Sequence, residues 1–232
     1  MKKALIIGAL IVLIVVSGTY TIESLYKSKE YAYQNDADLI RLEHLVYWSG
    51  LIEEYHKKTG YYPFQNQLVS EEQPGLVRIA TKNQQLYFKP KTDNYRKDLD
   101  NNPNKFFQEF TVKEFVSELE NKLGKSIDEK YDIQKVPTSS PIWYNYFVTN
   151  EGYLIWVPCI NCGVTKISTL LMDGITPTVN IASSEMKKNV TKALTREEMM
   201  NHPIFKDWQH NEYAKETYIR NLEQQNFQDS KH

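Results

Sequence analysis

The feature that most constrains this chain is a short apolar segment at its N-terminus. Residues 1–3 (MKK) give a positive start, and residues 4–16 form an unbroken apolar run of 13 residues. With the neutral stretch to Ile22 the segment reaches 19 residues, close to the roughly 20 that cross a bilayer. The small residues Ser17 and Gly18 also suit a cleavage site, so an anchor and a signal peptide both stay open, and we favour the anchor. In either case the positive end stays in the cytoplasm and the remainder is exported.

Length and charge narrow the class of protein. A chain of 232 residues has room for one domain of ordinary size in addition to an anchor. Lys and Arg number 28 against 29 Asp and Glu, so no overall positive field attracts nucleic acid. We therefore expect a single exported domain that does not bind nucleic acid.

A long helix is predicted after the apolar segment. From Thr19 to Lys58 there is no Pro, and apolar residues recur in steps of three and four on one helical face. Gly60 and Pro63 mark its end, because Gly permits a left-handed cap and Pro prevents the helix from resuming. The stretch 23–38 is too polar to be buried all round, so we expect it to stand in solvent or against a partner helix. The apolar positions are Leu39, Leu42, Leu45, Val46, Ile52 and Tyr55.

The rest of the chain predicts a mixture of helices and strands. Residues 64–110 indicate loops and one strand, since Pro and Gly interrupt short apolar pieces such as 86–88 (LYF). A capping box at Thr111 and Glu114 predicts a helix over 112–123, and a second one at Thr195 and Glu198 precedes a C-terminal helix after Pro203. Segments rich in branched and aromatic residues predict an antiparallel meander of three or four strands. They are 142–149, 153–157, 166–172 and 176–181.

These elements define an α+β fold in which a long N-terminal membrane-anchored helix packs on an antiparallel β-sheet, with further helices that include a C-terminal one. We divide the chain into a membrane anchor or uncleaved signal at residues 1–22 and a helical stalk at 23–60. An exported α+β domain follows at 61–225, and a disordered tail at 226–232.

The end of the long helix resembles a known family. The stretch 38–63 (DLIRLEHLVYWSGLIEEYHKKTGYYP) is similar to the end of the long helix in type II secretion pseudopilins and type IV pilins. Tyr55, Gly60, Tyr62 and Pro63 carry the likeness, which covers about the first 65 residues. The family's Gly-Phe leader, with Glu at the fifth position of the run, is absent here. The resemblance implies an anchored helix packed on an antiparallel sheet, and filament membership stays open.

Two cysteines form the sequence Pro-Cys-Ile-Asn-Cys-Gly at residues 158–163. A thioredoxin-type pair needs its first Cys at a helix N-terminus, whereas this chain continues as a predicted strand. A zinc site needs four ligands, and no second pair is present, so a metal would have to bridge two chains. In an oxidising compartment a small structural disulfide between Cys159 and Cys162 is the favoured interpretation. A functional thiol pair and a metal site remain as alternatives.

One acidic loop has part of a calcium-hand spacing. Asp98, Asp100, Asn102 and Glu109 match four of the ligand positions, but Pro103 occupies the place that requires Gly. We interpret the loop as solvated, with a differently shaped calcium site as the alternative.

No other catalytic or ligand-binding pattern stands out. The five histidines show no metal-binding pair at helical spacing, and no nucleophile sits in an elbow or Gly-rich motif. We interpret Glu43, Glu53 and Glu54 as the solvated face of the stalk, and His44 as a surface or packing residue. A ligand-binding module would need a pocket walled by aromatic rings, which strand alternation does not favour. The histidines are His44, His56, His202, His210 and His232, and the rings are Trp143, Tyr153 and Trp156.

We therefore expect a non-enzymatic envelope protein, with no catalytic residue, no metal and no cofactor. The inner membrane would be contacted through the N-terminal helix in a single pass, and a protein partner through the stalk. The domain would lie in the periplasm. The alternative is an anchored periplasmic enzyme or thiol-disulfide factor that uses the Cys159 and Cys162 pair.

Overall fold

A computed structural model describes residues 37–70, 73–85, 107–132, 142–159, 170–171, 177–212 and 216. Within these residues no helix is both long enough and apolar enough to span a membrane. The predicted anchor at residues 1–22 and most of the upper stalk lie outside the described residues, as does the predicted tail.

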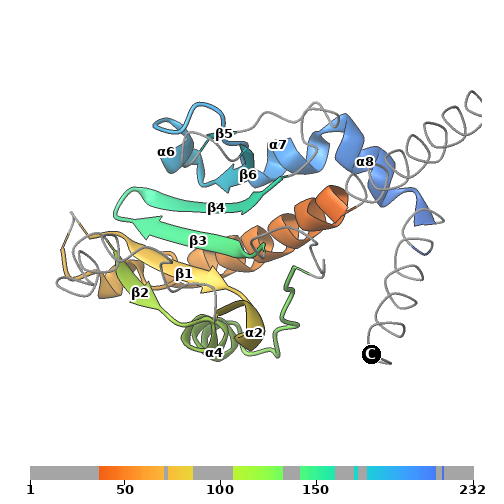
Figure 1. Cartoon of the computed structure of the whole chain (residues 1–232). Helices are drawn as coiled ribbons and strands as arrows, with labels where there is room; N and C mark the ends of the chain where they lie inside the picture. Colours follow the sequence, from red (N-terminus) through yellow and green to blue (C-terminus); the bar gives the residue numbers. More distant parts are fainter. Residues whose placement is uncertain are drawn as a thin grey trace, which may run out of the picture.

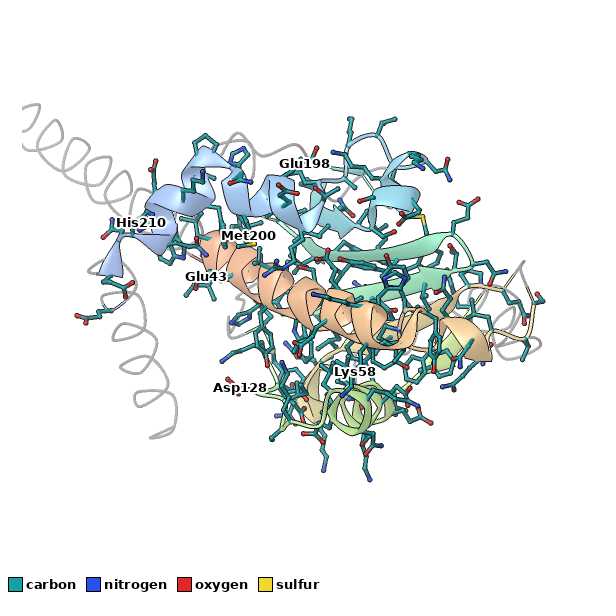
Figure 2. The ribbon with its side chains drawn as sticks, turned by 180° about the vertical axis from the view of Figure 1, so that it is seen from behind. Glu43, Lys58, Asp128, Glu198, Met200 and His210 are labelled. Atoms are coloured by element: carbon teal, nitrogen blue, oxygen red, sulfur yellow. The ribbon has the colours of Figure 1, made fainter. Side chains whose placement is uncertain are left out.

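The helix at residues 37–59, which we call the stalk helix, forms the centre of the core. It is the orange helix of Figure 1, and Figure 2 shows it in front of the sheet with Glu43 and Lys58 near its two ends. Side chains at three- and four-residue spacing, among them Leu42, Leu45 and Ile52, are fully buried against the sheet. The predicted apolar face and the predicted end near Lys58 are therefore confirmed.

In the described part of the chain the sheet has six strands, in the order β2-β1-β3-β4-β6-β5. Its strands are β1 (Gly75–Ile79), β2 (Gln108–Phe110), β3 (Tyr144–Thr149), β4 (Gly152–Pro158), β5 (Leu170–Leu171) and β6 (Pro177–Ala182). Residues alternate between the two faces along each strand, and the inner face that meets the stalk helix carries Tyr144, Tyr146, Val148, Tyr153 and Ile155, all fully buried.

The short helices surround this central pair. They are η1 (Gln65–Gln67), α2 (Lys82–Gln85), α4 (Val112–Leu123), α6 (Ser184–Lys187), α7 (Arg196–Asn201) and α8 (Pro203–Gln209). Helix α4 has the predicted bounds, and its capping box at Thr111 and Glu114 is present. The second capping box, at Thr195 and Glu198, starts α7. Figure 1 shows α4 at one edge of the fold and α6 and α7 at the other. The α+β fold and its capped helices were thus predicted correctly.

Two predictions about the sheet were wrong. The sheet is mixed, because β1 and β2 are parallel, and it is not a simple meander, because β6 lies between β4 and the edge strand β5. The strand β1 was missed because Pro74 and Gly75 look like turn residues. A side chain at Gly75 would stand 2.8 Å from Val148 of the neighbouring strand, so glycine allows the two strands to pack closely there. The 86–88 segment lies outside the described residues.

Candidate functional site

The base of the stalk helix carries a buried group of polar side chains, which we call the stalk-base cluster. Its members come from distant parts of the sequence and meet at the end of the domain where the described part of the stalk helix begins. They are Asp38, Arg41, His44, Asp132, Tyr144 and Cys159.

Two ion pairs hold the cluster together. Nη1 of Arg41 donates to Oδ1 of Asp38 at 2.6 Å, and Nε donates to Oδ1 of Asp132 at 2.9 Å. The Arg41 and Asp38 side chains are 1% and 2% exposed. Burial alone would lower the pKa of Arg41, but the two carboxylates outweigh it and raise the pKa above its ordinary value. Any movement of the helix base that separated these pairs would leave a buried charge without its partner, which is strongly unfavourable. We therefore expect the cluster to fix the direction of the helix base.

His44 extends the cluster with a neutral imidazole. Nδ1 of His44 lies 2.8 Å from the hydroxyl of Tyr144, and the two rings are in contact. Burial lowers the pKa of His44 to about 4, and the positive charges of Lys130 and Arg41 add to the effect, although Asp128 opposes it. His44 is therefore uncharged at neutral pH, in agreement with its predicted packing role.

Cys159 reaches the same cluster from the end of β4. It is 3% exposed and disulfide-bonded, and its Sγ lies 3.3 Å from Oδ2 of Asp38. A disulfide sulfur has no proton, so this is a contact and not a hydrogen bond. Cys162 lies outside the described residues, so its pairing with Cys159 stays a prediction. The surroundings of Cys159 are unlike those of a reactive cysteine, which needs nearby positive charge and some exposure.

The other end of the stalk helix is a corner made by the residues that carry the family resemblance. Gly60 adopts φ of 83°, and its N–H donates to the carbonyl of His56 at 2.8 Å, which forms the predicted left-handed cap. The ring of Tyr62 stacks on His56 with centroids 4.1 Å apart. The carbonyl of Pro63 accepts a hydrogen bond from the buried hydroxyl of Tyr146 at 2.9 Å.

Tyr55 completes this corner. Its side chain is fully buried in the core, and its hydroxyl donates to the carboxylate of Glu118 on α4. Burial, with the neighbouring carboxylate, raises the pKa of Tyr55 well above its ordinary value, so the hydroxyl remains a donor. The corner thus joins the stalk helix to both α4 and the sheet.

A groove runs along the stalk helix where it faces α7 and α8, and we call it the outer groove. Its volume is about 360 Å³. Arg196 is one of its lining residues; its Nε donates to the carbonyl of Val46 at 3.3 Å, and its guanidinium lies against Gly50. Figure 2 shows α7 and α8 beside the Glu43 end of the helix. The lining residues are Glu43, Val46, Tyr47, Gly50, Leu51, Glu54, Arg196, Phe205 and Gln209.

The predicted solvated face of the stalk was only partly right. Glu54 is exposed and pairs with Lys125 at 2.6 Å, and Glu43 lines the outer groove. Glu53 instead accepts a hydrogen bond from the hydroxyl of Tyr153 at 3.0 Å, because its position on the helix lies beside the buried face. Asp38, at the end of the stretch predicted to stand partly in solvent or against a partner helix, is buried in the domain.

The structure also bears on the predicted aromatic pocket, the acidic loop and a metal site. Tyr153 and Trp156 lie on opposite faces of β4, so a single pocket walled by these rings is excluded. Glu109 lies in β2 and pairs with Arg78 at 3.0 Å, while the other residues of the acidic loop lie outside the described residues. Among the residues that the structure describes, no group of three or more His, Cys, Asp and Glu could hold a metal ion.

The stalk-base cluster was missed, although part of its signal was present. At 100° per residue Asp38 and Arg41 fall on the same helical sector as Leu42 and Leu45, which marks two charges on an apolar face. Asp132 lies 91 residues from Arg41 in the sequence, and no spacing rule connects them.

Comparisons with known proteins add no assignment. No protein-family model matches this chain, and the searches of curated proteins and of solved structures returned no match either.

Proposed function

We propose that this chain is a non-enzymatic, membrane-anchored envelope protein with a pilin-like architecture, which acts through protein contacts in a secretion or surface assembly. The observation that carries the proposal is the double role of the stalk helix. It is the central core element of the α+β domain, and it follows in the chain on the N-terminal sequence that contains the apolar run. A partner that binds the upper stalk would therefore be coupled to the whole domain.

The way in which the helix is fixed supports this role. Ion pairs hold its base and the aromatic corner holds its far end, so the helix has little freedom to turn relative to the sheet. A rigid connection of this kind suits a protein that positions a domain relative to a membrane.

The surface of the helix also supports contacts with proteins. The outer groove leaves Glu43, Tyr47 and Glu54 on the stalk helix at least partly open to solvent, while Val46 and Leu51 between them are buried. This polar stretch of the helix is accessible to a partner.

The alternative function, a thiol-disulfide factor, is less well supported. Such a factor needs a cysteine with a lowered thiol pKa, at a helix N-terminus or beside a cation. Cys159 follows a strand, is buried, and has a carboxylate as its neighbour, which would raise a thiol pKa.

Site-specific photo-crosslinking in cells tests the proposal. A crosslinker at Tyr26 or Tyr33 in the upper stalk should give protein adducts that sediment with membranes. The matched control is Lys122, an exposed residue of α4 on the domain surface, which should give no such adduct. Recovery of the chain in the soluble fraction, with no adduct from the stalk positions, would refute the proposal.

A further inference from the structure

The contact between Cys159 and Asp38 has a chemical consequence for the disulfide. Oδ2 of Asp38 is 3.3 Å from Sγ, and both side chains are almost completely buried. The backbone of Cys159 is held beside Asp38, because its N–H donates to the carbonyl of Pro177 at 2.9 Å.

Asp38 is itself held in place. Its other carboxylate oxygen accepts the 2.6 Å hydrogen bond from Arg41, which also pairs with Asp132. These three side chains carry one positive and two negative charges, so Arg41 does not leave the sulfur beside an excess of positive charge. The sulfur instead faces a carboxylate in surroundings of low dielectric.

Reduction of the disulfide would place further negative charge at this point. A thiolate attacks one sulfur of the disulfide, the S–S bond breaks, and its electron pair leaves on the other sulfur. If Cys159 were attacked, an anion would have to approach Asp38. If Cys159 were the leaving sulfur, its own thiolate would form 3.3 Å from the carboxylate. Both routes are opposed by repulsion between like charges.

The end state is different from the transition state. A second thiol completes the reaction, which consumes two thiols and yields one external disulfide and two protein thiols. The Cys159 thiolate takes up a proton, and the neutral S–H can then donate to Oδ2 of Asp38. The carboxylate therefore opposes the passage between the two redox states more than it opposes the reduced state.

We propose that Asp38 slows the reduction of the Cys159 disulfide by thiols. This effect lasts as long as the stalk-base cluster is formed. The disulfide and the base of the stalk are coupled through this contact.

The test compares two variants that remove equal charge from the same cluster. Asp38→Asn removes the charge that touches the sulfur, and Asp132→Asn removes the other carboxylate of Arg41. The rate of reduction of the full chain by dithiothreitol should rise at least about tenfold in Asp38→Asn, since a nearby buried charge easily accounts for that factor. In Asp132→Asn the rate should stay within about threefold of the unchanged protein, because no charge is removed from the side of Cys159. Equal rates in all three proteins, or an equal rise in both variants, would overturn the proposal.

Local unfolding is tested in the same experiment. Opening before attack gives a rate that either levels off at the unfolding rate or follows the fraction of unfolded protein, and both quantities are measured in urea for each variant. For Asp38→Asn the expected rate rises with the concentration of dithiothreitol and exceeds what the unfolded fraction accounts for. A rise that the unfolded fraction or the unfolding rate explains would show that loosening and not charge is responsible, and would overturn the proposal.

A second measurement reads the thiol itself. In Cys162→Ser the Cys159 thiol should titrate above the ordinary pKa of about 8.5 for cysteine, as followed by thiolate absorbance. Adding Asp38→Asn should lower that pKa. An ordinary or lowered pKa of Cys159 in Cys162→Ser alone would contradict the proposed repulsion between Asp38 and a sulfur anion.

Discussion

At Asp38 the stalk helix is held by buried ion pairs, and near Tyr55 the same helix is held by aromatic packing and by hydrogen bonds from tyrosine hydroxyls. The stalk-base cluster depends on ionisation states, because Arg41 is stable in the core only with both carboxylates charged. The corner depends on ring packing and on the hydrogen bond from the Tyr146 hydroxyl to the Pro63 carbonyl, in which neither partner is charged. One end of the helix is therefore held by buried ion pairs beside a disulfide, and the other end is held by packing and by an uncharged hydrogen bond.

The largest loss of stability is expected at the stalk-base cluster. Arg41→Ala leaves Asp38 and Asp132 buried without their shared cation, so it should lower the free energy of unfolding by about 3 to 5 kcal/mol. Urea denaturation measures this change. Lys125→Ala, which removes the exposed pair with Glu54, is the control and should cost less than about 1 kcal/mol. Similar losses in the two variants would mean that the cluster does not hold the base.

A pH effect of intermediate size follows from His44. Its pKa in the folded state is about 4, below the ordinary 6.5, so the unfolded chain binds more protons between these values. Stability from this group is complete above pH 6.5 and is lost as the pH falls through 6.5 toward 4. The loss at pH 4.5 should be about 2 to 3 kcal/mol.

His44→Asn provides the comparison for this prediction. The carboxylates titrate in both proteins, so the difference between their stability curves isolates His44. Urea denaturation from pH 4.5 to 7.5 should show a steeper slope for the unchanged protein. Parallel curves would show that His44 is not held neutral in the folded state.

A smaller loss of stability is expected at the aromatic corner. Tyr146→Phe removes the donor to the Pro63 carbonyl and leaves that carbonyl without this bond, which should cost about 1 to 2 kcal/mol. Unlike the loss from His44, this loss should be the same at pH 5 and pH 7.5. The control is Tyr131→Phe, whose hydroxyl bonds an exposed Glu129, and its effect should be within about 0.5 kcal/mol of zero. A pH-dependent loss in Tyr146→Phe would remove the contrast between the two ends.

The smallest effect concerns the cap of the stalk helix. Gly60→Ala introduces a side chain at φ of 83°, with an expected cost of about 1 kcal/mol. Gly60→Asn should cost less, because Asn tolerates the left-handed region better than Ala. Thermal denaturation of the two variants measures the difference, and equal losses would indicate that the backbone at Gly60 relaxes.

The sequence was most informative where local rules determine structure. The capping boxes at Thr111 and Thr195 and the end of the stalk helix at Gly60 were predicted because each depends on residues within four positions. The parallel pairing of β1 with β2, and the position of β6 beside β4, depend on contacts between distant segments that no local pattern encodes.

The site shows the same limit. Asp38 and Arg41 could have been recognised as charges on an apolar helix face, but their partners Asp132 and Cys159 are 91 and 121 residues away. The resemblance to pilins, predicted from Tyr55, Gly60, Tyr62 and Pro63, stays a prediction, because no family model and no solved structure matches the chain. The function that the likeness implies remains a proposal.

The most direct test of the central claim is the intact mass of the native protein from isolated membranes, recorded without and with reduction before alkylation. The account predicts recovery with the membrane, a mass that retains residues 1–18, and alkylation of two cysteines only after reduction. A mass that corresponds to a chain starting near Thr19, found in the soluble fraction, would contradict the anchored stalk. Alkylation without reduction would contradict the disulfide.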